Sequence, residues 1–238
     1  MISLNNLSFS YPKSERKILN KLDVVFEKGI LNVIVGLNGA GKTTLFDILI
    51  GQYKPSEGGI VNVPEMKDIL YHVQGAYISF LVTGKDYVRL IYASSNLNYY
   101  SDSNAMVENM DFENDRDRVK FINLWGKRIG QMSIGERRWL YIVTLSQIKK
   151  KMYIFDEPTA GVDPSARIGI YKRLEKLTLD KSSTVILATH HLHELQELNC
   201  KIILLHEGCI KFQGNYKQFL LNHNTDNPDH AFDSYINC

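Results

Sequence analysis

The alternation of apolar and polar residues differs between two parts of the chain. From Ile2 to Phe9 and from Leu22 to Phe26, apolar residues alternate with polar ones, as in antiparallel strands that bury one face. Further along, short apolar runs separate stretches with helical spacing. These runs predict strands at residues 31–35, 69–73, 152–155, 184–188 and 201–205. The sequence therefore predicts an α/β fold with a mostly parallel sheet and an N-terminal antiparallel β subdomain.

The pattern between residues 84 and 130 is helical, polar and aromatic, with a loop expected at residues 99–104. We interpret this stretch as a small helical subdomain inserted into the α/β core. Residues 1–222 are then one domain, and the polar residues 223–238 are expected to form a weakly ordered C-terminal tail.

Composition narrows the class of protein. The 238 residues suffice for one large α/β domain, and 44% hydrophobic with 23% charged residues is ordinary for a globular protein. The net charge of +2 gives no reason to expect nucleic acid as a partner. No secretory signal and no apolar run near the roughly 20 residues of a membrane span stand out, and the three cysteines fit reduced thiols. We expect a soluble, cytoplasmic protein.

The strongest chemical signal runs from Gly36 to Thr43, which matches the phosphate-binding loop G-x-x-x-x-G-K-[ST] at every fixed position. An apolar strand precedes it, and a helix predicted from Lys42 to Ile50 follows it, as the motif requires; a chance glycine turn would need neither. Lys42 would reach the β- and γ-phosphates of ATP, and the Thr43 hydroxyl would bind Mg²⁺. The predicted ATP-binding residues of this loop are Asn38, Gly39, Ala40, Gly41, Lys42, Thr43 and Thr44.

A second signal is the apolar strand from Met152, which ends in Asp156 and Glu157. An acid at the carboxyl end of a strand beside the phosphate-binding loop can hold Mg²⁺, which suits Asp156. The next carboxylate can act as the general base for the attacking water, which suits Glu157. Without the loop upstream, a solvated turn would be the better explanation of the pair.

Together with five further elements in the same order and spacing, these motifs resemble the ATPase domains of ABC transporters over nearly the whole chain. The resemblance makes Tyr11 the aromatic residue that stacks on adenine, although Phe9 could take that part and Tyr11 could be a core residue. It makes Gln74 the glutamine that binds Mg²⁺ and touches the attacking water.

The segment beginning at Met132 resembles the family signature, usually Leu-Ser-Gly-Gly-Gln. Ser133, Gly135 and Glu136 would then contact ATP held by the opposite protomer. Two residues depart from the pattern, because Ile134 replaces a glycine and Glu136 replaces an amide. The segment is also typical of a capping box that begins a helix. Because a negative charge near phosphate is unfavourable, the Glu136 carboxylate would have to be engaged by this capping box or by Arg137 or Arg138.

Two further residues complete the resemblance. Asp163 matches the D-loop aspartate that contacts the other protomer, although it could instead cap the helix beginning at Pro164. His190, at a strand end, matches the switch histidine that binds the γ-phosphate and positions water. A metal site within the cluster of histidines at 190–193 is the weaker interpretation, because the spacing lacks an i, i+4 pair.

The resemblance implies an active, Mg²⁺-dependent ATPase with Glu157, His190 and Gln74 as catalytic residues and Thr43, Gln74 and Asp156 around the metal. It also implies a second ATPase domain, in a homodimer or heterodimer, and a separate transmembrane permease that holds the chain on the cytoplasmic face of the membrane. Export is favoured over import by the sequence of the D-loop. The alternatives are a soluble ABC ATPase of an assembly complex, as in iron–sulfur cluster biogenesis, and an unrelated nucleotide kinase.

Overall fold

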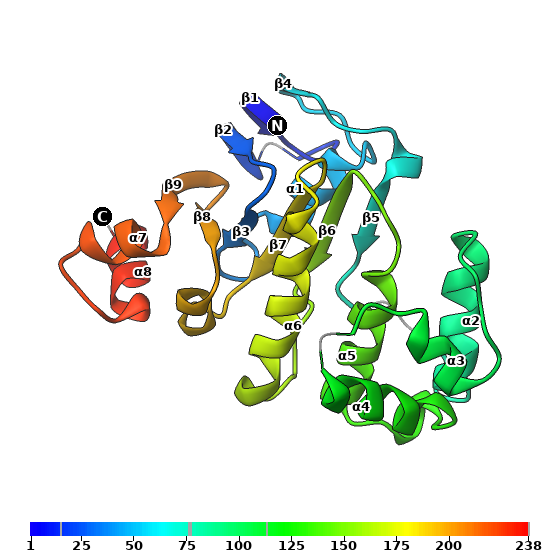
Figure 1. Cartoon of the computed structure of the whole chain (residues 1–238). Helices are drawn as coiled ribbons and strands as arrows, with labels where there is room; N and C mark the ends of the chain where they lie inside the picture. The colour runs from blue at the N-terminus through cyan, green and yellow to red at the C-terminus, as the bar shows by residue number, and fades with distance from the viewer. Residues whose placement is uncertain (15, 76–77, 113, 238) are drawn as a thin grey trace. The chain divides into compact units, whose positions relative to one another are not determined.

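The computed structural model describes residues 1–14, 16–75, 78–112 and 114–237 (Figure 1). The chain divides into two compact units. Unit 1 comprises Met1–Gln74, Lys150–Pro158 and Leu174–Cys238, and unit 2 comprises Gly75–Lys149 and Thr159–Arg173.

A three-stranded antiparallel sheet opens unit 1, in the order β2-β1-β4. Its strands are β1 (Ile2–Phe9), β2 (Leu19–Phe26) and β4 (Glu57–Val61). In β2, buried and exposed positions alternate along most of the strand, as its sequence pattern predicts. The sequence analysis did not predict β4, whose first residues include two glycines and carry no apolar alternation.

The second sheet of unit 1 has six strands in the order β5-β6-β7-β3-β8-β9. These are β3 (Leu31–Val35), β5 (Ile69–His72), β6 (Met152–Asp156), β7 (Thr184–Thr189), β8 (Cys200–His206) and β9 (Cys209–Asn215). All neighbours pair in parallel except β8 and β9, which form an antiparallel hairpin. Every residue of β3, β6 and β7 is buried, which explains why these strands appear in the sequence as largely apolar runs.

One hydrophobic cluster joins the two sheets of unit 1 to α1 (Lys42–Leu49). Phe46 of α1 is fully buried in this cluster, together with Phe26 of β2 and Ile154 of β6. A buried phenylalanine contributes roughly 2–3 kcal/mol through the apolar area that it removes from water. The cluster therefore fixes α1 and the loop before it against the carboxyl ends of the central strands.

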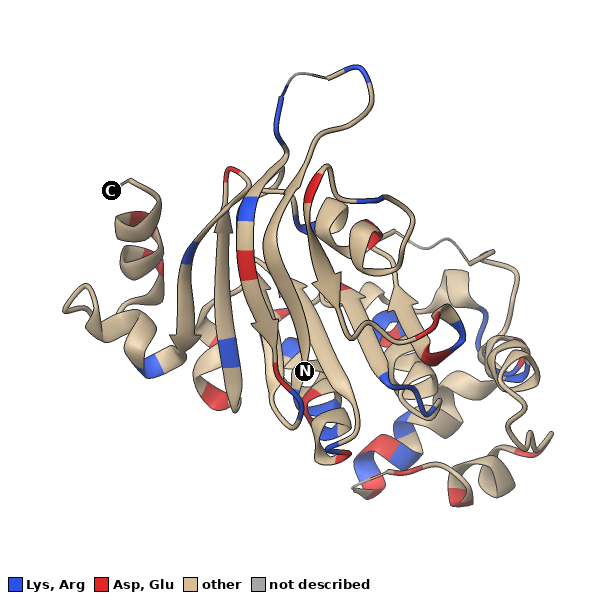
Figure 2. Cartoon of the chain, turned by 90° about the horizontal axis from the view of Figure 1, so that it is seen from above, with Lys and Arg blue, Asp and Glu red and all other residues tan. Residues whose placement is uncertain are grey.

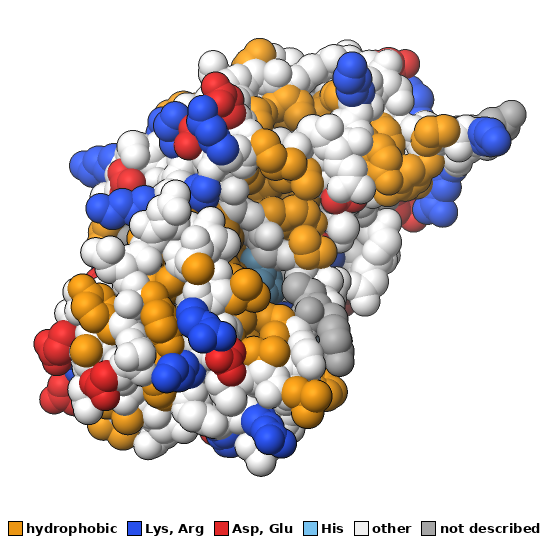
Figure 3. All heavy atoms as spheres, turned by 90° about the vertical axis from the view of Figure 1, so that its right-hand side faces the viewer, with side chains coloured by type: hydrophobic (Ala, Val, Ile, Leu, Met, Phe, Trp, Pro, Cys, Tyr) orange, Lys and Arg blue, Asp and Glu red, His pale blue; other side chains and the backbone are white. Residues whose placement is uncertain are grey.

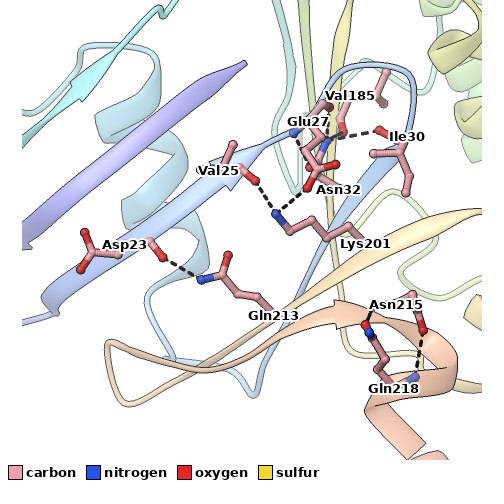
Figure 4. Close-up of polar contacts among 10 residues, drawn as sticks. All are labelled: Asp23, Val25, Glu27, Ile30, Asn32, Val185, Lys201, Gln213, Asn215 and Gln218. Carbon is pink, nitrogen blue, oxygen red and sulfur yellow. Dashed lines mark hydrogen bonds and ion pairs between the residues drawn. The ribbon is translucent and has the colours of Figure 1, made fainter.

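The open edge of β2 is covered by polar side chains from the other sheet (Figure 4). The Lys201 ammonium donates to the carbonyl of Val25 at 2.8 Å and to the Glu27 carboxylate at 2.8 Å. The Gln213 amide donates to the carbonyl of Asp23 at 2.7 Å. Strand-edge carbonyls that are satisfied in this way do not recruit a further strand.

Unit 2 is built from helices, and each of four α-helices begins at a polar residue whose side chain accepts a backbone N–H. The helices are α2 (Gly84–Ser94), α3 (Ser103–Glu108), α4 (Asp115–Trp125), α5 (Ile134–Leu145) and the larger part of α6 (Pro164–Lys176). In the view of Figure 2, basic and acidic residues are intermixed along the ribbon. Within the described ranges, no helix is both long and apolar enough to span a bilayer.

The last residues of the chain are more ordered than their polarity indicates. They follow α7 (Tyr216–Leu221) and form α8 (Pro228–Ile236), in place of the weakly ordered tail expected from residue 223. The Asn227 side chain accepts the N–H of Asp229 to begin the helix, and Phe232 is buried. Pro228 and Ala231 are buried as well, and the Tyr235 ring packs on Phe212 of β9 and Phe219 of α7, so several contacts hold this short helix against β9.

Candidate functional site

The phosphate-binding loop connects the centre of the parallel sheet to α1. β3 pairs with β7 on one side and β8 on the other, so the loop leaves the sheet between two buried strands. Two glycines make its path possible. A Cβ at Gly36 would lie 2.3 Å from the carbonyl oxygen of Leu205, and one at Gly41, whose φ is +109°, would lie 2.7 Å from Leu19 Cδ2.

Lys42, the first residue of α1, is buried with only 7% of its surface exposed. Its ammonium donates to the carbonyls of Gly36 at 2.7 Å and Leu37 at 3.2 Å, and lies 3.6 Å from Glu157 Oε1. A buried cation requires such partners, since desolvation is otherwise costly. The loop's own carbonyls therefore hold the lysine at the N-terminus of α1.

Asp156 and Thr43 form a pair of oxygen donors between β6 and α1. The Thr43 hydroxyl donates to Asp156 Oδ2 at 2.7 Å. Asp156 is 1% exposed, and its Oδ1 has no hydrogen-bond partner among the described residues. Burial, supported by the nearby Glu157 charge, raises the pKa of Asp156, while the Thr43 hydrogen bond and Lys42 act in the opposite direction.

Glu157 has the most constrained backbone of the site. It is 2% exposed and adopts a φ of 47°, in the left-handed region that non-glycine residues seldom occupy. Its N–H donates to the carbonyl of Ala188 on β7 at 3.1 Å. Its Oε2 lies 3.0 Å from Nδ1 of His190, the residue after β7, whose side chain is about half exposed. The carboxylate thus lies between Lys42 and His190.

These residues border a cavity of about 450 Å³ in unit 1. Tyr11 lines it, with its hydroxyl 3.0 Å from Thr44 Oγ1 and its ring edge-on to Tyr53. Phe9, the alternative candidate for stacking on adenine, is 4% exposed and does not line the cavity. The predicted residues that line it are Tyr11, Asn38, Gly39, Gly41, Lys42, Thr43, Thr44, Gln74, Asp156 and Glu157.

Two predicted residues of unit 1 are missing from this lining. Ala40 is 5% exposed and packs in the hydrophobic cluster, while its carbonyl accepts the N–H of Gly208. His190 borders an adjacent cavity of about 310 Å³, together with Leu37 and Phe232. Gln74 does line the main cavity and is exposed.

The signature residues lie in unit 2, at the beginning of α5. Ser133 caps the helix: its Oγ accepts the N–H of Glu136 at 3.1 Å, and Glu136 Oε2 accepts the N–H of Ser133 at 2.8 Å. This reciprocal pair is the capping box that the sequence predicted. Ile134, which replaces a glycine, is 46% exposed, and Gly135 lies within the first turn.

The D-loop belongs to unit 2, and the histidine cluster belongs to unit 1. Asp163 is exposed, and its carbonyl accepts the N–H groups of Ala166 and Arg167 at the beginning of α6. His193 Nε2 lies 2.9 Å from Asp229 Oδ2, whereas His190 faces Glu157. Across the described part of the chain, no group of three or more His, Cys, Asp or Glu side chains is arranged to hold a metal ion.

The donors in unit 1 fit a nucleotide with Mg²⁺. The unpartnered Asp156 Oδ1 and the Thr43 hydroxyl are the hard oxygen ligands that Mg²⁺ prefers. Lys42 and the N–H groups at the start of α1 supply positive charge, and the loop glycines leave no side chain in the way.

Comparison with known proteins decides the family. Residues 19–160, more than half of the chain, match the family model described as ABC transporter. The chain belongs to this family. ATP binding and hydrolysis by an ABC ATPase subunit follow from that membership, and the phosphate-loop NTPase fold predicted from the sequence is confirmed.

Known proteins of similar length match most of the chain. Protein McbF of Escherichia coli is 27% identical over 226 residues, which cover 94% of this chain and 90% of McbF. The high-affinity zinc uptake system ATP-binding protein ZnuC of Bacillus subtilis is 26% identical over 215 residues, which cover 87% of this chain and 92% of ZnuC. The solved structure of an ATP-binding subunit of an ABC transporter matches with a TM-score of 0.78 at 21% identity, covering 99% of both chains.

One charged partner of the signature was missed by sequence reasoning. The capping box expected from the sequence does occupy the Glu136 carboxylate. Its charged partner is Lys127, whose ammonium lies 2.8 Å from Glu136 Oε2, in place of the expected Arg137 or Arg138. No pattern in the sequence signals this pair, because Lys127 belongs to the loop after α4.

Proposed function

We propose that this ABC protein is the Mg²⁺-dependent, ATP-hydrolysing subunit of a transporter, in which ATP-driven closure and opening of two ATPase domains drives substrate translocation by a separate membrane protein. The observation that supports it most is the setting of Glu157, a buried carboxylate between Lys42 and His190 at the mouth of the phosphate-binding loop. A turn that only connected β6 to the next segment would not require a buried acid with a strained backbone at that position.

In this proposal Glu157 accepts a proton from the water that attacks the γ-phosphate, and His190 keeps the carboxylate oriented from the other side. Lys42 exchanges the loop carbonyls for phosphate oxygens, and Tyr11 stacks on the base. Mg²⁺, held by Thr43, Gln74 and Asp156, would neutralise charge on the phosphates. Electrostatic positioning supplies most of the rate acceleration in such reactions.

The variant Glu157→Gln tests the assignment. It keeps the size of the side chain but cannot accept a proton, so we expect ATP binding to persist while turnover falls by about 100-fold or more. Binding is measured by equilibrium dialysis with ATP, and turnover by phosphate release with Mg²⁺ or with a chelator. Turnover close to the wild-type rate in this variant would contradict the role of Glu157. Wild-type turnover in the presence of the chelator would contradict the need for Mg²⁺.

The signature and D-loop residues complete the proposal. Ser133, Gly135 and Glu136 would meet ATP bound by a second ATPase domain, and Asp163 would contact that domain. Ser133 and Ile134 are exposed at the start of α5, and the N-terminal end of a helix attracts anions.

A membrane partner is supported by the apolar surface of unit 2. Phe80, Leu81 and Leu90 are 53%, 76% and 64% exposed, and Figure 3 shows hydrophobic side chains among the charged ones on the side where α2 lies. Exposed apolar surface of this kind marks contacts with other proteins. Through such a partner the chain would be held on the cytoplasmic face of the membrane.

Co-purification from detergent extracts separates transport from the alternative, a soluble ABC ATPase of an assembly complex. A multi-span membrane protein that accompanies the chain and stimulates its turnover supports transport. Soluble partners alone would support the assembly role. One relative belongs to a zinc uptake system, so family membership does not choose a direction, and export stays a prediction.

A further inference from the structure

The Glu136 carboxylate takes part in a small network of unit 2 that fixes its position and its charge. Its Oε2 accepts the N–H of Ser133 at 2.8 Å and lies 2.8 Å from Nζ of Lys127. Although partial burial acts to raise the pKa of Glu136, the Lys127 ammonium and the Ser133 N–H lower it overall. Glu136 is therefore an anion at neutral pH. Lys127 is its ion-pair partner, and the charge of Lys120 acts on it as well.

Two backbone hydrogen bonds hold Lys127 in place. Its N–H donates to the carbonyl of Leu124 at 3.2 Å, and its carbonyl accepts the N–H of Gly84 at 3.0 Å. These bonds tie the lysine to the end of α4 and the start of α2. The ammonium consequently reaches Glu136 from a fixed point.

Stability alone is a weak reason for this pair. The two side chains are 34% and 32% exposed, and ion pairs at that exposure contribute little to folding. A carboxylate near phosphate, by contrast, carries a large electrostatic penalty, because like charges at short range repel strongly. The positive N-terminal end of a helix attracts anions, but a negative side chain in its first turn weakens that attraction.

We propose that Lys127 is a positioning residue for ATP hydrolysis, which neutralises Glu136 so that the start of α5 can accept the phosphates of ATP bound by a second ATPase domain. The inference rests on the proposed function of the signature segment and assigns to it a residue outside the motif. Glu136 then serves as the family's amide does: its oxygen holds the capping box while its charge is cancelled.

Substitution of Lys127 tests the inference. Lys127→Met should lower kcat about five- to tenfold, and less at high salt, because the uncompensated carboxylate repels phosphate. Binding of ATP to the phosphate-binding loop, measured by dialysis, should be unchanged. Lys127→Arg keeps the charge and should retain most activity. The matched control is Lys149→Met, which removes the same charge from an exposed position of unit 2.

The deciding variant is Lys127→Met combined with Glu136→Gln. The glutamine can still form the capping box but carries no charge, so kcat should return to the value of Glu136→Gln alone. An activity loss that the second substitution does not restore would show that Lys127 acts only on structure, and equal rates for Lys127→Met and Lys149→Met would also overturn the inference. If the wild type binds ATP but does not dimerise and does not hydrolyse ATP, the proposed function itself is wrong, whatever the Lys127 variants do.

Discussion

The negative charge of Asp156 lowers the stability of the folded protein. Burial raises its pKa, so the folded protein holds this proton more tightly than the unfolded chain does. The stabilising contribution of Asp156 is complete below its unfolded pKa and is lost as the pH rises through the folded pKa. At neutral pH, therefore, the ionised carboxylate destabilises unit 1.

Asp156→Asn should consequently melt about 2–4 °C higher than the wild type at pH 7 without Mg²⁺, although its Mg²⁺-dependent turnover should be lost. The difference in melting temperature should shrink as the pH falls through the folded pKa of Asp156, because the protonated carboxyl is then as neutral as the amide. Calorimetry across this range measures it, with the exposed Asp226→Asn as control. A lower melting temperature for Asp156→Asn at pH 7 would contradict the assigned direction of the pKa.

At the scale of single residues, the sequence located most of the candidate site because the site is built from contiguous motifs. The phosphate-binding loop and the strand ending in Asp156 and Glu157 were recognisable from spacing, and the structure brings them together around one cavity. The partner of Glu136 was not recognisable. Arg137 and Arg138 follow it directly on α5 and point to other faces of the helix, whereas Lys127 reaches it from a different segment.

Helix α8 gives a prediction at the scale of elements. Phe232 is 9% exposed and is the large apolar side chain of α8 within the core of unit 1. Phe232→Ala should lower the free energy of unfolding by about 2–3 kcal/mol, towards the low end for buried phenylalanines because Phe232 borders a cavity. Urea denaturation measures the change, and Asp233→Ala, exposed on the same helix, is the control. Equal stabilities would mean that α8 is not docked.

The elements that sequence reasoning found and missed differ in burial. β3, β6 and β7 are buried along their whole length, and their apolar runs made them visible. β4 and β9 lie at sheet edges, where one side faces solvent and the apolar pattern fades. α8 was missed because polar residues separate its few buried ones, which are Pro228, Ala231 and Phe232.

At the scale of the whole molecule, the sequence pattern placed a helical insert at residues 84–130, and that boundary stays a prediction. The compact unit in the structure is larger and also includes Thr159–Arg173, which come shortly after β6 and well beyond residue 130. A linear pattern of apolar residues cannot reveal such a union, because it depends on contacts between distant segments. The phosphate-binding loop belongs to unit 1 and the signature to unit 2. The proposed function pairs the loop of one chain with the signature of a second chain.

Mixing two inactive variants tests this expectation. Lys42→Met removes the lysine of the phosphate-binding loop, and Ser133→Arg blocks the signature with a bulky side chain, so each protein alone should lack turnover. In a mixed pair, the intact loop of one chain meets the intact signature of the other and restores one site of two. With equal amounts, half of the pairs are mixed, and phosphate release should recover to roughly a quarter of the wild-type rate. Recovery would require both proteins in the same tube and would disappear on dilution, whereas no recovery at any concentration would mean that loop and signature do not meet across two copies of this chain.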